Sequence, residues 1–130
     1  MNLFFLILLV LAAGIILLTP SKNQRRLQKA QETENLLTRG ESALLRHDNR
    51  EAIGCYEQAV LLAEEGGFAM AKAEANFGLA RAYANLGNRH DAAEFVRRSL
   101  SERAIWEAHF PHLARAYENK LQELEDDINS

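Results

Sequence analysis

The hydrophobic and polar residues follow two different patterns along the chain. Residues 3–18 read LFFLILLVLAAGIILL and hold no polar side chain. From Gln24 to Ser130 the apolar residues instead recur with the three-to-four-residue spacing of amphipathic helices, and no stretch alternates as a strand would. The pattern therefore predicts an all-α chain in which an apolar N-terminal helix precedes a series of amphipathic helices.

Breaks in the amphipathic pattern divide the second region into separate helices. Glycines occur where helices are expected to end, at positions 66–67 and 87. Asp48 and Asn88 are suitable N-cap residues, and Pro111 suits the start of a helix. These signals predict helices near residues 22–46, 49–65, 69–86, 89–104 and 111–128.

The apolar segment predicts a transmembrane anchor over residues 1–20. With Met1, Asn2 and Thr19 it reaches about nineteen residues, or ~28 Å as a helix, close to the thickness of a hydrocarbon core. A cleaved signal peptide is the main alternative, but no Lys or Arg precedes residue 22 and TPSKNQ is a poor cleavage site. The single cysteine, Cys55, lies too far along the chain for a lipoprotein signal.

A basic cluster follows this segment and carries the expected topology. Its members are Lys22, Arg25, Arg26 and Lys29, with no acidic residue among positions 21–31. Such a cluster fits anionic headgroups at a membrane surface and favours a cytoplasmic location for the chain that follows. We therefore expect a single-pass protein of a bacterial inner membrane with a cytoplasmic C-terminal domain; an organellar membrane is the alternative. The expected parts are the anchor 1–20, a basic juxtamembrane helical linker 21–33 and a domain 34–130.

Composition narrows the function of that domain. All 15 Lys and Arg and all 18 Asp and Glu follow the apolar segment, and the formal net charge of −3 argues against binding to nucleic acid. One cysteine cannot form an internal disulfide. The chain after the anchor is long enough for one small domain.

The chain also contains an internal repeat. The sequence LARAY occurs at 79–83 and again at 113–117, 34 residues apart. When Arg39 is aligned with Leu79, two helix–turn–helix units coincide, with residues 47–52 on 87–92. Small residues then match in both helices of each unit, Gly40 with Ala80 and Ala52 with Ala92. Over about residues 34–119 the chain resembles the tetratricopeptide repeat.

The resemblance implies two stacked helix pairs and a capping helix. Helices approach closely where small residues meet, and a repeat that cannot bury its apolar face alone stacks on its neighbour. The second LARAY starts a third unit that continues as an acidic helix, 111–128, and this helix is expected to cap the array. The sequence departs from the family pattern in four ways. The first two units are 40 residues apart, Ala43 and Ser99 stand where an aromatic residue and alanine are usual, and no proline ends either unit at the usual place.

Catalytic motifs are missing from the sequence. It has no phosphate-binding loop, no HExxH and no cysteine cluster. His109 and His112 flank Pro111 without further residues at metal-ligand spacing, and Cys55 beside Tyr56 reads as a packed thiol. We therefore expect no catalytic, cofactor or metal site, and a protein that is not an enzyme.

The resemblance further implies that the first helix of each unit lines a concave face for a protein partner. Arg81 and Arg115 occupy equivalent places, so an acidic or carboxylate-bearing segment is the expected occupant; pairing with Glu74 or Glu118 is the alternative. The family's basic clamp for a terminal carboxylate is not expected here, because Leu37, Glu41 and Gly78 stand at its positions. The full set of expected contact residues is Glu41, Leu44, Leu45, Arg81, Asn85 and Arg115.

These features predict an interaction protein. The expected function is that of a membrane-anchored tetratricopeptide adaptor or assembly factor for a membrane-associated complex. The alternative is a small accessory subunit whose helix packs permanently into a large membrane complex. The expected partners are other subunits of such a complex, with the bilayer contacted through residues 1–20; no cofactor, small-molecule substrate or nucleic acid is expected.

Overall fold

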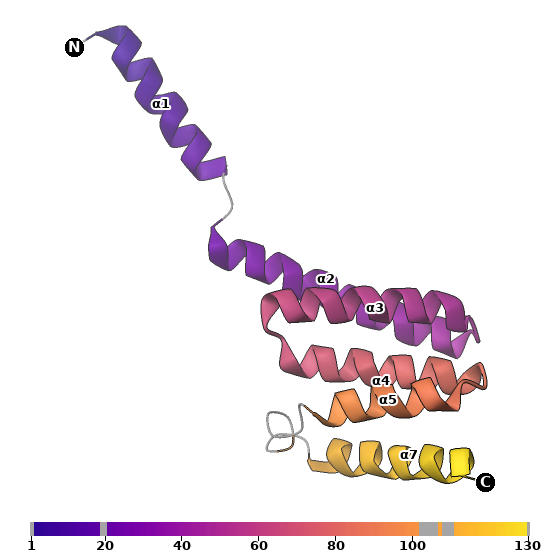
Figure 1. Cartoon of the computed structure of the whole chain (residues 1–130). Coiled ribbons are helices and arrows are strands. Elements are labelled where there is room, and N and C mark those ends of the chain that lie inside the picture. Colours follow the sequence, from indigo (N-terminus) through magenta and orange to yellow (C-terminus); the bar gives the residue numbers. More distant parts are fainter. Residues whose placement is uncertain (1, 19–20, 102–106, 108–110, 130) are drawn as a thin grey trace.

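The chain is all-helical. The computed structural model describes residues 2–18, 21–101, 107 and 111–129, and in this part it contains six helices and no strand (Figure 1). The helices are α1 (Leu3–Leu18), α2 (Lys22–Leu45), α3 (Asn49–Gly66), α4 (Ala69–Asn85), α5 (Arg89–Leu100) and α7 (Pro111–Asn129).

The local signals in the sequence place most helix ends to within one residue. Asp48 and Asn88 are N-caps as expected: each side-chain oxygen accepts a hydrogen bond from the backbone N–H three residues later, at 3.2 and 3.4 Å. The helix expected over 89–104 is described only to Leu100, because residues 102–106 lie outside the described chain.

Each of the three turns that join α2 to α3, α3 to α4 and α4 to α5 contains one residue in the left-handed region. Gly67 and Gly87 have φ of 71° and 82°, as suits glycine after a helix end. His47 occupies the corresponding place after α2 with φ of 61°, where a side chain adds steric cost. The three turns are thus alike although only two of them use glycine.

The helices stack as antiparallel neighbours. α2 and α3 form the first pair, α4 and α5 form the second, and α7 packs against α5 at the end of the stack (Figure 1). α2 also contacts α4, so these two first helices lie on one side of the stack.

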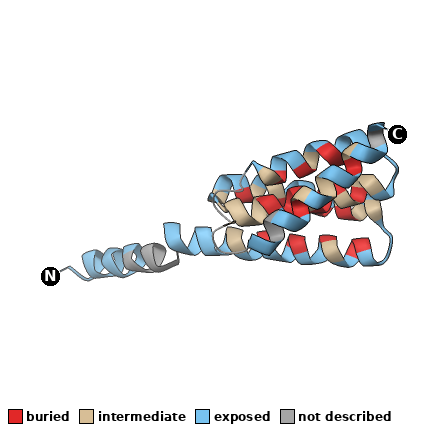
Figure 2. Cartoon of the chain, turned by 90° about the horizontal axis from the view of Figure 1, so that it is seen from below, coloured by how far each residue is buried: buried red, intermediate tan, exposed pale blue. Residues whose placement is uncertain are grey.

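The core is rich in alanine, which explains the close spacing of the helices. Ala43, Ala52 and Ala59 are fully buried in the first pair, and Ala80 and Ala92 are buried where the second pair meets α7. Small side chains at a crossing point allow two helix backbones to approach. The buried residues accordingly lie on the inner faces of the helices (Figure 2).

Ser99 shows why one departure from the repeat pattern is tolerated. It is fully buried on α5, and its hydroxyl donates a hydrogen bond of 2.9 Å to the backbone carbonyl of Ala73 on α4. A buried hydroxyl with a partner avoids the cost of an unsatisfied polar group. The serine therefore joins the two helices of the second pair.

The predicted transmembrane anchor is wrong, and so is the single-pass membrane localisation, in a bacterial inner or an organellar membrane, that rested on it. Among the helices that the structure describes, none is both long and apolar enough to cross a membrane. α1 spans only 16 residues, or ~24 Å at 1.5 Å per residue, which is shorter than a hydrocarbon core of about 30 Å. In Figures 1 and 2 this helix stands apart from the stack.

The predicted linker over residues 21–33 is part of a longer helix. α2 runs without interruption from Lys22 to Leu45 and so crosses the expected boundary between residues 33 and 34. Its start is capped by Ser21, whose hydroxyl accepts from the backbone of Gln24 while the Gln24 side chain accepts from the backbone of Ser21. The basic cluster therefore lies on the first turns of a helix that later enters the core.

Candidate protein-binding groove

A groove of about 620 Å³ runs along the side of the stack formed by α2 and α4. α2 contributes residues spaced three or four apart, which places them on one face of the helix. α4 lines the opposite wall, and one tyrosine each from α3 and α7 completes the surface. The lining residues are Glu34, Leu37, Thr38, Glu41, Ser42, Leu45, Tyr56, Glu74, Phe77, Arg81 and Tyr117.

The floor of the groove is apolar and largely aromatic. Phe77 of α4 stacks on Tyr117 of α7 with ring centroids 4.0 Å apart and planes inclined by 27°. Leu37 and Tyr56 are buried beside them, whereas Leu45 at the rim keeps 74% of its surface exposed. The groove thus offers apolar surface that is open to solvent.

Tyr56 is held between two glycines of neighbouring helices. A Cβ built on Gly40 of α2 would lie 2.7 Å from the Tyr56 ring, and one on Gly78 of α4 would lie 2.4 Å from it. Real side-chain carbons do not approach so closely, so any other residue at either position would displace the ring. The two glycines therefore allow this ring of α3 to lie between α2 and α4.

A hydrogen-bonded ion pair spans the groove above this ring. The Arg81 guanidinium donates to both carboxylate oxygens of Glu41, at 2.9 and 3.1 Å, and the Tyr56 hydroxyl donates to the same carboxylate at 3.3 Å. The bonds from Arg81 lower the pKa of Glu41, while partial burial opposes this effect. Burial, together with the Glu41 charge, raises the pKa of Tyr56. Arg81 is thus already engaged in a two-pronged contact.

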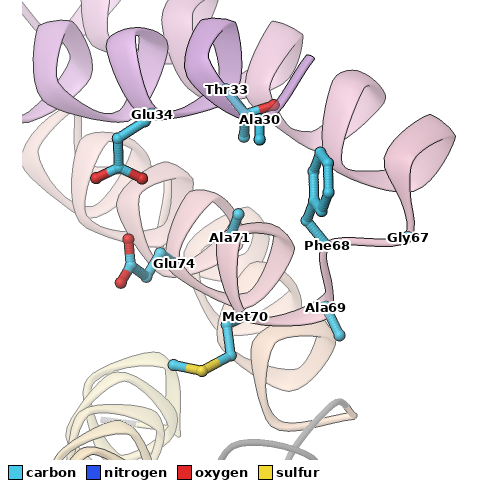
Figure 3. Close-up of a pocket in the computed structure, with 9 residues that line it drawn as sticks. All are labelled: Ala30, Thr33, Glu34, Gly67, Phe68, Ala69, Met70, Ala71 and Glu74. Atoms are coloured by element: carbon cyan, nitrogen blue, oxygen red, sulfur yellow. The ribbon is translucent and has the colours of Figure 1, made fainter. Parts of the chain in front are cut away.

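A second hollow of about 550 Å³ continues the groove toward the start of α2 (Figure 3). The two hollows share Glu34 and Glu74, whose carboxylates turn toward one another across the space in Figure 3. Burial raises the pKa of Glu74, and the charges of Glu34 and Glu41 raise it further. The remaining lining is nearly apolar and consists of Ala30, Thr33, Gly67, Phe68, Ala69, Met70 and Ala71.

The structure brings together only some of the contact residues expected from the sequence. Glu41, Leu45 and Arg81 line the groove. Leu44 is instead part of the core, with 6% of its surface exposed. Asn85 is exposed near the end of α4, where its side-chain amide donates to the Asn49 side chain at 3.1 Å.

Arg81 and Arg115 do not both line the groove. Arg81 is bound to Glu41, and not to Glu74 or Glu118 as the sequence alternative had it. Arg115 is exposed, but among the described residues that line the groove α7 is represented by Tyr117 and not by Arg115. The surface expected for an acidic segment is therefore not present in that form.

The four basic residues at the start of α2 differ in their surroundings. Lys22 and Arg25 are exposed. The Arg26 guanidinium lies 5.5 Å from the centroid of the Phe68 ring, and Lys29 lies 3.6 Å from the Glu65 carboxylate. Two members of the basic cluster thus contact the stack itself.

Sequence reasoning missed Glu34, Phe77 and Tyr117 as groove residues. For Glu34 the sequence held a signal, because Glu34, Leu37, Glu41 and Leu45 recur at intervals of three or four residues and so share one face of α2. The part of α7 that meets α4 could not be foreseen from α7 alone. Within the described chain, no three His, Cys, Asp or Glu side chains come together as a metal site, and Cys55 is buried.

No protein-family model matches the chain, and neither curated proteins nor solved structures yield a match.

Proposed function

We propose that the chain is a protein-interaction module of the tetratricopeptide type, whose groove holds a segment of a partner protein. The observation that carries this proposal is the open, apolar groove between the first helices of successive pairs, with aromatic floor and an exposed leucine at its rim. Concave apolar surfaces with a few placed polar groups are the usual form of binding sites. The repeated LARAY sequence and the matched small residues support the family.

The dimensions of the groove suit a short peptide segment. A third hollow of about 440 Å³ near Leu27 shares Ala30 and Phe68 with the second, so three hollows follow one another along α2. From Leu27 to Leu45 this helix rises ~27 Å. That length matches a helical segment of about eighteen residues, or an extended one of about eight.

The groove is also well ordered for binding. Tyr56 is confined between glycines and hydrogen-bonded to Glu41, and the Phe77 and Tyr117 rings are stacked. A surface that is already fixed in position loses little conformational entropy when a ligand binds. The floor therefore presents rigid apolar contacts to a partner.

The test uses peptides selected from a random displayed library on the full chain. We expect the selected peptides to bind Leu45→Asp at least tenfold more weakly, because a charge at the rim interrupts the apolar contact. Leu61→Asp is the matched control, since Leu61 is also exposed (61%) but lies on α3 and outside the lining of the groove. Equal binding to the wild type and to both variants would reject the groove as the binding site.

A second candidate, a stoichiometric accessory subunit, is favoured by α1. Each large apolar residue from Leu3 to Leu11 is exposed. A contiguous apolar surface of this kind marks a place where another protein packs. In that case, when the full chain is purified through a C-terminal tag, the partner co-purifies at a constant molar ratio. Deletion of residues 3–18 from the tagged chain abolishes this co-purification. A ratio that varies with salt and dilution would exclude this role.

A further inference from the structure

We propose that the segment held in the groove carries a basic side chain, Lys or Arg, that lies between Glu34 and Glu74, with apolar residues on both sides of it. This inference rests on the proposed function. It names the partner chemistry of the same groove, and it reverses the acidic segment that the sequence suggested.

The charge balance of the lining supports this occupant. Among the described residues, the groove is lined by three carboxylates, Glu34, Glu41 and Glu74, against one cation, Arg81. Because Arg81 binds both oxygens of Glu41, these two charges offset one another. The remaining negative charge belongs to Glu34 and Glu74, which line both the groove and the second hollow.

The same two carboxylates are poorly placed without a cation. In the described chain no Lys, Arg or His lies within 4.0 Å of either, whereas Glu34 and Glu41 both raise the pKa of Glu74 by repulsion. Like charges near one another are unfavourable, the more so where burial affects one of them, and a cation between them reduces that penalty. Arg81 cannot turn to them without breaking its contact with Glu41.

The apolar surfaces on either side define the flanking residues. Toward the end of α2 the groove offers Leu37, Phe77 and Tyr117, and toward its start the second hollow offers Phe68 and Met70. A long basic side chain can lay its aliphatic part along such surfaces and keep its charged end at the carboxylates. A segment with apolar residues before and after one Lys or Arg therefore matches the groove along its whole length.

The composition of the selected peptides gives the first test. Peptides that bind the wild-type full chain, and that lose affinity for Leu45→Asp, are expected to share a Lys or Arg flanked by apolar residues. Replacing that Lys or Arg by Met in a synthetic peptide should weaken binding about tenfold or more, because the attraction to the two carboxylates is lost. This readout needs no variant at the two glutamates.

The second test removes the charges from the protein. In Glu34→Gln with Glu74→Gln the same peptides should bind about tenfold more weakly, and a new selection should keep the apolar residues but lose the basic one. Glu32→Gln with Glu57→Gln is the matched control, because both residues are exposed acids outside the lining and the net charge changes equally. Affinity in this control should stay within twofold of the wild type.

The possible failures are distinguishable. Peptides that depend on Leu45 but are acidic, or have no charge preference, would overturn this inference and leave the proposed function standing. Equal weakening in both pairs of variants would also overturn it, because the effect would then come from net charge alone. Absence of any peptide that depends on Leu45 would overturn the inference together with the proposed function.

Discussion

The confinement of Tyr56 between Gly40 and Gly78 predicts that two identical glycine substitutions have opposite effects. Gly78 and Gly54 both lie inside helices, α4 and α3. A Cβ at Gly78 would lie 2.4–2.6 Å from three atoms of the Tyr56 ring, whereas a Cβ at Gly54 has no neighbour within 4 Å. Only the first substitution therefore introduces a steric conflict.

The magnitudes follow from two opposing terms. Alanine favours a helix interior over glycine by roughly 1 kcal/mol, and this gain applies at both sites. Overpacking in a core costs roughly 1–3 kcal/mol. The upper end applies at Gly78, because the ring also lies against Gly40 and cannot move away. We expect Gly78→Ala to lower the free energy of unfolding by about 1–2 kcal/mol, and Gly54→Ala to raise it by about 0.5–1 kcal/mol.

Urea and thermal unfolding of the full chain, followed by circular dichroism, measure both changes. For a domain of this size 1 kcal/mol corresponds to roughly 4–8 °C in Tm. A double-mutant cycle identifies the cause: in a Tyr56→Leu background the cost of Gly78→Ala should largely disappear. If Gly78→Ala stabilises the chain as much as Gly54→Ala does, the ring is not held between the glycines and this reasoning fails.

Three further predictions concern the packing, a turn and the ion pair. Ala92→Leu should lower the free energy of unfolding by roughly 1–3 kcal/mol, because Ala92 is fully buried. Glu94→Leu, on the exposed face of the same helix, should be nearly neutral. Equal Tm values for the two variants would refute the close packing at Ala92. His47→Gly should raise the free energy of unfolding by about 0.5–1 kcal/mol, because His47 has φ of 61°, a conformation that glycine adopts without steric cost. A lower stability in urea would contradict this. Glu41 stabilises the fold above its ordinary pKa of 4.5, because Arg81 lowers its folded-state pKa. This contribution is lost as the pH falls through the lowered pKa, so the wild type and Glu41→Gln should converge in unfolding free energy below about pH 4.5, and a constant difference down to strong acid would exclude the linkage.

The helix boundaries could be predicted from the sequence because they depend on local chemistry. Asp48 and Asn88 accept hydrogen bonds from backbone groups three residues away, and Gly67 and Gly87 supply the left-handed turns. Such interactions involve residues close together in the sequence, so both partners can be identified without the tertiary structure. The small residues Ala52, Ala80 and Ala92, which the repeat places at the helix crossings, are buried.

Leu44 and Leu45 show that hydrophobic periodicity does not separate core positions from surface positions at single-residue precision. The two leucines are adjacent, and both were expected on the contact surface, yet one is in the core and the other is 74% exposed. Successive residues on a helix point about 100° apart, so an uncertainty of one residue in register exchanges a core position for a surface position. The packed neighbours decide that register.

The length of α1 decides whether the apolar N-terminal segment can cross a membrane. The sequence prediction counts about nineteen positions with the flanking residues, of which Met1 and Thr19 lie outside the described chain, and the described helix holds 16 residues. The difference of one turn decides whether a helix reaches across a hydrocarbon core. A prediction of membrane crossing therefore depends on where the helix begins and ends, which the apolar run alone does not define.

What the sequence by itself determined is the set of helices, their caps, and the repeated small residues that allow them to stack. What only the tertiary structure decided is the charge of the groove. Arg81 meets Glu41 across 40 residues, and Glu34 faces Glu74 from another helix. These partners come together because α2 packs on α4, and the packing depends on shape complementarity between surfaces that are remote in the chain. The distance between remote groups decides which charges cancel and which remain, and this balance is the basis of the partner chemistry that we propose.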